Sequence, residues 1–257
     1  MTVSADNIRN SRRVCNEFYS RVISARISPY FSAAFIRMGI SANAVTFMML
    51  IAGIIFPLMM LSHNIVVQMT GALCLPLINV FDTSDGEVAR YSKATSDLGV
   101  YADKVFQLVI DINIYVVVAM LLFRQAGNVY YSVPAVISLL LYMVDIVSKE
   151  IFMRMMSRRP DMENHKAAIR FQKKSILKYF VHITSSNTGI CHIIWAILLL
   201  DYLVYRGRAV SALFVYTTYL ALCQLMKLIL RQRSVYVLLR EEPHPLSATD
   251  SCDEQAV

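Results

Sequence analysis

The stretch VFDTSDGEVARYSKATSDLGVYADKVFQ, residues 80 to 107, decides the fold, because it sets Asp82, Asp85 and Asp103 within a chain of long apolar segments. The runs that flank it are long enough to cross a bilayer, which takes about 20 helical residues. The chain has 257 residues, of which 56% are hydrophobic and only 17% are charged. Backbone amides in hydrocarbon are satisfied only within a helix or a closed barrel. We therefore predict an all-α integral membrane protein.

Six transmembrane helices are expected, roughly at 44–61, 65–84, 97–123, 132–154, 187–205 and 209–231. Residues 15–39 mix apolar and aromatic residues with arginines, which predicts an N-terminal cytoplasmic amphipathic helix, broken near Pro29. The same stretch also fits a simple basic stop signal for the first span. Ser41 or Asn43 is expected to cap that span. The predicted division is an interfacial segment, a six-helix membrane domain and a disordered cytoplasmic tail, at 1–41, 42–235 and 236–257.

The orientation follows from lysine and arginine. Twenty of them lie before the first span, after the second and fourth spans, or at and beyond the end of the sixth, against three on the other side. Cytoplasmic loops carry the excess of basic residues, so both termini and residues 80–107 are expected on the cytoplasmic side. The net charge of +7 then reflects topology and attraction to anionic membrane lipids. It does not indicate nucleic-acid binding, because no compact basic domain is present.

The aspartates are spaced to converge. Asp82 and Asp85 share one helix face, and Asp103 lies about two turns into the next span, at the same membrane border. Unpaired carboxylates in a membrane cost about 2.5–3.5 kcal/mol each, so a bound cation is expected. Oxygen ligands favour Mg²⁺, Mn²⁺ or Ca²⁺ over zinc. The alternative is structural: Asp82 caps the helix end, and Asp103 pairs with Lys104 or Arg90.

Small residues and an arginine adjoin the aspartates. Gly86 and Ala89 leave a smooth strip at the end of the second span, and Arg90 carries a guanidinium that suits a phosphate. Gly99 is expected to face them across the loop and to allow close helix approach. A divalent ion, an arginine and small residues together predict a site for a pyrophosphate.

The pattern resembles the signature of the CDP-alcohol phosphotransferase (CDP-alcohol phosphatidyltransferase) family. Eight positions are fixed in that signature, and this chain supplies seven at the family's spacing, namely Asp82, Asp85, Gly86, Ala89, Arg90, Gly99 and Asp103. The first span is also similar to the family's Pro-Asn-x-x-Thr start, with Asn43 and Thr46 retained and Ala42 in place of the proline.

The resemblance implies an activity. A CDP-linked alcohol binds through its pyrophosphate, a second alcohol attacks the phosphorus, and CMP leaves. It further implies Mg²⁺ or Mn²⁺ ligated by Asp82, Asp85 and Asp103. It implies a nucleotide site formed by Gly86, Ala89, Arg90, Gly99, Asn43 and Thr46. The acceptor is then an alcohol, a lipid or a phosphorylated polyol, and the expected assembly is a homodimer.

Gln107 stands where the family has its fourth aspartate, which contributes to metal binding and is proposed as the base. It lies i+4 from Asp103, on the same helix face. Its amide carries no charge and accepts no proton at neutral pH. The second of two metal sites is therefore expected to be weakened. Loss of a general base typically lowers a rate by roughly 10²–10⁴-fold.

Three interpretations follow from Gln107. The chain is an enzyme whose base lies elsewhere or whose acceptor is already acidic. Otherwise it is a catalytically silent homologue that binds a CDP-linked ligand or lipid as a regulatory or partner subunit. Otherwise Gln107 is an introduced change. Asp111, one further turn along, is a candidate replacement base. Asp145 is another, although an Asp145–Lys149 ion pair on one helix face is favoured.

The acceptor site is predicted from basic residues of the fourth span and the loop after it, chiefly Lys149, Arg154 and Arg158. If they converge, the acceptor is an anion; if they point to lipid headgroups, they anchor helix ends. Two other classes fit less well. A prenyltransferase needs a second aspartate-rich motif in spans four to six, and a channel needs a polar path across the membrane.

Overall fold

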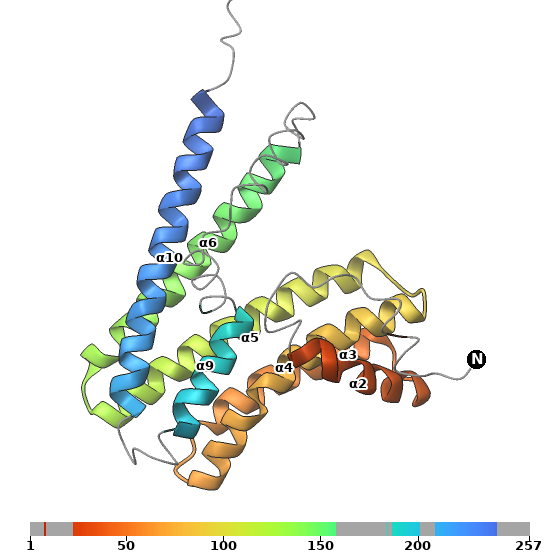
Figure 1. Ribbon diagram of the computed structural model, residues 1–257, viewed down its shortest axis with the longest axis horizontal. Coiled ribbons are helices and arrows are strands. Elements are labelled where there is room, and N and C mark those ends of the chain that lie inside the picture. Colours follow the sequence, from red (N-terminus) through yellow and green to blue (C-terminus); the bar gives the residue numbers. More distant parts are fainter. Residues whose placement is uncertain (1–7, 9–22, 158–183, 185–186, 201–208, 241–257) are drawn as a thin grey trace, which may run out of the picture.

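The computed structural model describes residues 8, 23–157, 184, 187–200 and 209–240, and within them every regular element is a helix (Figure 1). In chain order these are α2 (Ala25–Arg37), α3 (Ala42–Met59), α4 (Ile65–Tyr91), α5 (Asp97–Ala126), the 3₁₀ turn η2 (Val129–Tyr131), α6 (Val133–Ser157), α9 (Asn187–Leu200) and α10 (Ala209–Arg240). The predicted all-α class is confirmed.

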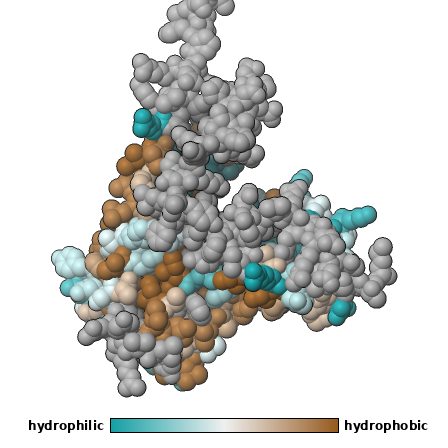
Figure 2. Space-filling view, viewed as in Figure 1, coloured by the Kyte–Doolittle hydropathy of each residue, from teal (hydrophilic) through white to brown (hydrophobic). Residues whose placement is uncertain are grey.

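Five segments of the described chain are long and apolar enough to cross a membrane, and they coincide with α3, α4, α5, α6 and α10. The expected span at 187–205 corresponds to α9, which has 14 described residues, and 201–208 lie outside the described residues. The count of six spans therefore stays a prediction. Figure 2 shows apolar side chains along α10 and around the turn between α3 and α4, as a lipid-facing surface requires.

Helix α4 carries Asp82 and Asp85 on its last turns. α4 has 27 residues and continues to Tyr91, seven residues beyond the expected end of the span at 84. At 1.5 Å per residue it is about 40 Å long, so its end reaches past the hydrocarbon core. Lys93 then takes a positive φ of 51°, which turns the chain toward α5. Ser96 caps α5, because its Oγ accepts the Gly99 N–H at 3.0 Å.

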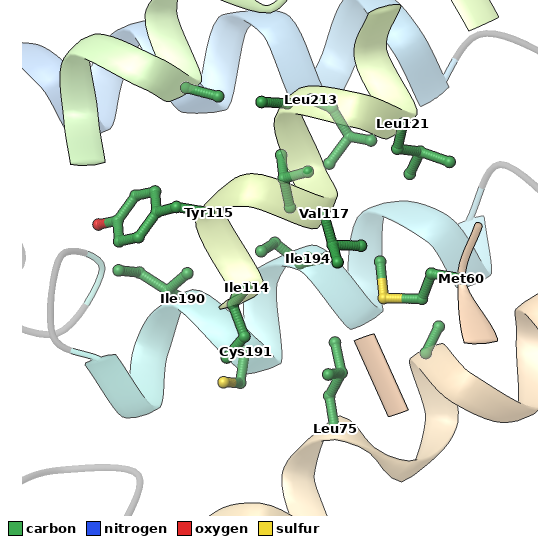
Figure 3. Packing of buried hydrophobic residues seen from close by; sticks show 14 of the residues in the cluster. Met60, Leu75, Ile114, Tyr115, Val117, Leu121, Ile190, Cys191, Ile194 and Leu213 are labelled. Atoms are coloured by element: carbon green, nitrogen blue, oxygen red, sulfur yellow. The ribbon is translucent and has the colours of Figure 1, made fainter. Parts of the chain in front are cut away.

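The helices form two arms joined by α5. In Figure 1, α6 and α10 run side by side in one arm, and α3 and α4 lie with the first half of α5 in the other. α5 packs against α3 in one arm and against α6 in the other. Figure 3 shows the core at this junction, where Leu75, Val117, Ile194 and Leu213 come from four different helices. The motif thus stands at the free end of one arm.

A glycine sets the spacing of α3 and α5. A Cβ added at Gly53 would lie only 2.4 Å from Ile110 Cγ1, so no larger residue fits unless the Ile110 side chain of α5 moves. Asn113 of α5 donates to the Gly53 carbonyl at 3.0 Å across the same contact. This close approach aligns the first turn of α3 with the first turns of α5.

Two details at the chain ends differ from expectation. The predicted break near Pro29 is wrong, because α2 runs through it. Pro29 is the fifth residue of that helix, so its missing N–H removes only the bond to the carbonyl of Ala25 in the first turn. α10 stays helical to Arg240, five residues past the boundary expected at 235. Ser41 caps α3 as expected, since its Oγ accepts the Ala44 N–H at 3.3 Å.

Candidate functional site

Asp82 is held by the residue that replaces a carboxylate in the sequence pattern. Gln107 Nε2 of α5 donates to Asp82 Oδ1 of α4. The other end of the same amide, Oε1, accepts from Lys104 Nζ at 3.2 Å, one turn earlier on α5. Gln107 therefore links the two motif helices through a neutral bridge.

Asp85 is the most buried of the three aspartates, with 8% of its surface exposed. Its Oδ2 accepts the hydroxyl of Thr46 at 2.9 Å, so the first turn of α3 contacts the acid directly. Asp82 and Asp103 both lie within electrostatic range of Asp85. Two helices thus bring the three carboxylates into one neighbourhood, and a third helix contacts Asp85.

Asp103 has one carboxylate oxygen engaged and one without a partner. Its Oδ2 lies 3.6 Å from Lys104 Nζ, and that lysine side chain is 69% exposed. Its Oδ1 is buried and makes no hydrogen bond to any described residue. The structural alternative in which Asp103 pairs with Lys104 therefore accounts for one carboxylate oxygen, Oδ2, and not for the other. A buried carboxylate oxygen without a donor is costly, which points to a missing cationic or hydrogen-bonding partner.

The donor set fits a hard divalent cation by its chemistry. It offers three carboxylates and the amide oxygen of Gln107, and the orphaned Asp103 Oδ1 lacks a partner of this kind. Within the described residues, however, no group of three or more His, Cys, Asp or Glu side chains is close enough to hold an ion. Asp82 is instead hydrogen-bonded to Gln107, and Asp103 is paired with Lys104. The predicted metal ligands stay a prediction.

The residues predicted to bind phosphate, Gly86, Ala89 and Arg90, lie together at the end of α4. A Cβ on Gly86 would lie 3.1 Å from Arg90 Nη1 and 3.5 Å from Nη2, so the guanidinium lies over the glycine. Arg90 Nε is buried and has no hydrogen-bond partner among the described residues. Ala89 is half-buried beside them. The smooth strip therefore exists, and the arginine itself covers part of it.

Gly99 serves a different neighbour from the one expected. A Cβ at Gly99 would lie 3.0 Å from Asn43 Oδ1, so the first turn of α5 meets the first turn of α3 rather than the Gly86–Ala89 strip. Asn43 and Thr46 are one turn apart, and Thr46 reaches Asp85. The expected nucleotide-binding residues of α3 thus border the aspartates.

The basic residues predicted to bind the acceptor do not gather at the aspartates. Lys149 and Arg154 lie exposed on the last turns of α6, in the other arm (Figure 1), and Arg154 Nε pairs with Glu150 at 3.2 Å. Arg158 lies outside the described residues. The predicted Asp145–Lys149 pair is wrong: Asp145 Oδ1 pairs with Arg231 Nη1 of α10 at 2.6 Å. Sequence spacing reveals partners on one helix, whereas this partner comes from a helix 86 residues away.

Asp111 has a partner that sequence analysis missed. The hydroxyl of Tyr142, on α6, donates to Asp111 Oδ2 across the junction of the two arms. Tyr142 is 7% exposed, and Asp111 is half-buried. Membrane helices rarely carry acids without a partner or a function, so the sequence alone indicated that Asp111 has a role. The identity of its partner on α6 could not be predicted from the sequence.

A second polar contact between helices also escaped the sequence analysis. Glu87, fully buried on the face of α4 away from the three aspartates, accepts hydroxyl hydrogens from Ser28 at 2.8 Å and Ser32 at 2.6 Å. Both serines lie on α2, one turn apart. Their i, i+4 spacing was the available signal. This contact fixes α2 against the helix that carries the motif.

Comparison with known proteins agrees with the motif. The sequence model described as CDP-alcohol phosphatidyltransferase matches residues 39–230, which include all the described aspartates of α4 and α5. Among curated proteins no significant match is found.

Proposed function

The chain belongs to the CDP-alcohol phosphatidyltransferase family, and on that premise we propose that it transfers a substituted phosphate from a CDP-linked alcohol to a second alcohol and releases CMP. The family implies transfer of phosphate-linked alcohol groups at a membrane, and the apolar helices agree with an integral membrane protein. The metal ligands, the roles of the site residues, the membrane topology and the homodimer are also proposed.

The observation that carries the proposal is the grouping of Asp82, Asp85 and Asp103 at the end of α4 and the start of α5. Asp85 is within electrostatic range of the other two acids, and Asp103 Oδ1 is buried without a partner among described residues. Acids within electrostatic range of one another repel, so the arrangement favours a cation there. A structural role for the acids leaves that oxygen unexplained.

Asp82, Asp85 and Asp103 would hold Mg²⁺ or Mn²⁺, with the amide oxygen of Gln107 as a neutral ligand at a weakened second position. When bound, such an ion neutralises phosphate charge and the charge on the departing CMP. Thr46 keeps Asp85 oriented through its 2.9 Å hydrogen bond. Arg90 donates to the nucleotide phosphates, for which its unpartnered Nε is suited. Gly86, Ala89, Gly99 and Asn43 shape the adjoining surface.

The expected topology and assembly complete the proposal. We propose six spans, with both termini and the site on the cytoplasmic side, a membrane-interfacial α2, and a homodimer. The distribution of lysine and arginine supports the orientation. The exposed Ile27 and Tyr30 of α2, opposite its buried serines, support contact of that helix with lipid.

One observation favours a second candidate, a catalytically silent homologue that binds a CDP-linked ligand or lipid. Gln107 donates its amide hydrogen to Asp82, so the residue at the expected position of the base is engaged as a neutral hydrogen-bonding group. Such a protein would bind the donor and release no CMP.

The deciding experiment measures CMP release from CDP-diacylglycerol and from CDP-choline, with Mg²⁺ or Mn²⁺, across a panel of alcohol acceptors. The variants are Asp82→Ala, Gln107→Asp and, as a matched control, Asp97→Asn, an exposed acid on the first turn of α5 outside the motif. Activity in the unaltered protein and in Asp97→Asn, but not in Asp82→Ala, supports the transferase. Activity only in Gln107→Asp supports the silent homologue. No release from any of them refutes the donor class.

A further inference from the structure

The proposed reaction requires a group that takes a proton from the acceptor alcohol, and Gln107 does not provide one. The next carboxylate along the same helix is Asp111, four residues later. Four residues advance an α-helix by about 6 Å and rotate it by about 40°. Asp111 therefore lies one turn deeper than Gln107 and close to the same face.

The structure orients this carboxylate. Tyr142, 7% exposed on α6, donates its hydroxyl hydrogen to Asp111 Oδ2. The rings of Tyr142 and Tyr115 are packed with centroids 5.6 Å apart, and Tyr115 follows Asp111 by one turn on α5. Asp111 is consequently held in place by a second helix and walled by aromatic rings, while remaining half-buried rather than sealed.

A buried tyrosine within electrostatic range of Asp111 meets a buried glutamine of α10. Tyr115 is 4% exposed and Gln224 of α10 is 2% exposed, and the two face one another. Neither the Tyr115 hydroxyl nor Gln224 Oε1 meets hydrogen-bond geometry with any described residue. Buried polar atoms are nearly always partnered, by protein, water or ligand. The Tyr115 hydroxyl lies within electrostatic range of Asp111, so polar atoms that a hydroxyl-bearing molecule would satisfy lie near this carboxylate.

We propose that Asp111, positioned by Tyr142, is the proton acceptor of this protein and takes the place of the carboxylate absent at Gln107. This inference rests on the proposed transferase function. The acceptor's O–H bond breaks and its proton moves to Asp111. The oxygen keeps the electron pair and forms a bond to phosphorus, and the bond from phosphorus to the CMP oxygen breaks with its electrons on CMP. CMP leaves as the anion, and Asp111 later returns its proton to water.

Asp111 and Tyr142, without a catalytic role, would form only an interhelical hydrogen bond, which is common between membrane helices. Rescue separates the two roles. Gln107→Asp restores a carboxylate one turn away, so it replaces a missing base but does not replace a hydrogen bond between α5 and α6. Asn113→Ala is the matched control, because Asn113 also lies on α5 and donates across to another helix, at the Gly53 carbonyl.

The test measures CMP release from CDP-diacylglycerol or CDP-choline, whichever the unaltered protein uses, together with the melting temperature of each variant. We expect Asp111→Asn to lose roughly 10²–10⁴-fold in kcat, as for a lost general base. Tyr142→Phe, which leaves the acid in place but less oriented, is expected to lose about 10-fold, and Asn113→Ala less than 3-fold. The double variant Gln107→Asp/Asp111→Asn is expected to recover most of the activity.

Two results would overturn the inference while leaving the transferase intact. One is Asp111→Asn with activity within 3-fold of the unaltered protein. The other is a large loss in Asp111→Asn that Gln107→Asp does not recover, which assigns Asp111 a structural role. Absence of CMP release from the unaltered protein would instead remove the proposed function, and this inference with it.

Discussion

Gln107 offers the sharpest test of the aspartate cluster, through stability rather than activity. Gln107→Asp and Gln107→Asn have side chains of equal length, and both lose the amide that donates to Asp82 from its present position. A hydrogen bond to a charged group contributes about 1.5–3 kcal/mol, so both variants should be destabilised by that order. Only Gln107→Asp adds a charge, and the difference between the two variants isolates it.

The size of that difference follows from the position of Asp82. Two carboxylates about 5 Å apart repel by about 3 kcal/mol at an effective dielectric constant of about 20. Protonating one ordinary aspartate at pH 7 costs about 4 kcal/mol, which caps the penalty at a similar value. At about 2–4 °C per kcal/mol for a chain of this size, Gln107→Asp should melt at most about 6–12 °C below Gln107→Asn in chelator, because Lys104, whose Nζ lies 3.2 Å from Gln107 Oε1, offsets part of the repulsion.

Adding a divalent ion should reverse the order. A fourth carboxylate strengthens binding of a hard cation, and each tenfold gain in affinity stabilises the folded state by about 1.4 kcal/mol at saturation. The assay is the melting temperature in detergent, with EDTA and with a Mn²⁺ series, for both variants and the unaltered protein. Equal melting of the two variants in EDTA, with equal Mn²⁺ shifts, would refute the inference that Gln107 and Asp82 share a cation site.

Three further predictions concern contacts that support the site. Thr46→Val keeps the shape of the side chain but removes its hydrogen bond to Asp85. We expect the free energy of unfolding to fall by about 1.5–3 kcal/mol, and an unchanged denaturation midpoint would contradict this expectation. Glu87→Ala leaves two buried serine hydroxyls of α2 without their acceptor, and should lower the melting temperature more than Glu87→Gln, which keeps one acceptor oxygen; equal melting of both would argue against the contact. Gly53→Ala places a Cβ 2.4 Å from an Ile110 carbon and should destabilise by about 1–3 kcal/mol, recovered in part by Ile110→Ala in a double-mutant cycle; strictly additive losses would refute the close approach.

Much of the site could be predicted because its members are close in the chain. Asp82, Asp85 and Arg90 fall on the last turns of one helix, and helical periodicity alone puts the two acids on one face. Gln107 was identified as the unusual residue from the resemblance to the family signature, and it contacts Asp82 across the two motif helices.

The partners of these residues were a different matter. The predicted partner of Asp145 was Lys149, its neighbour on the same helix, whereas the actual partner is Arg231 of α10. Nothing in the local pattern joins Asp111 to Tyr142, or Glu87 to the serines of α2. Gly99 was assigned to the wrong neighbour for the same reason, because it faces Asn43 across a contact set by Gly53 and Ile110.

The sequence by itself determined the all-helical class, the apolar helices long enough to cross a membrane and the three acids that form one group. These depend on hydropathy over about 20 residues and on a repeat of 3.6, both of which are local properties of the chain. Only the tertiary structure decided which polar group hydrogen-bonds or pairs with each acid. In a membrane, an apolar helix surface is about equally stable against lipid and against protein. The choice of neighbouring helix therefore depends on close packing and on a few interhelical hydrogen bonds. Those are satisfied by residues 25 to 86 positions apart, and no local pattern specifies them.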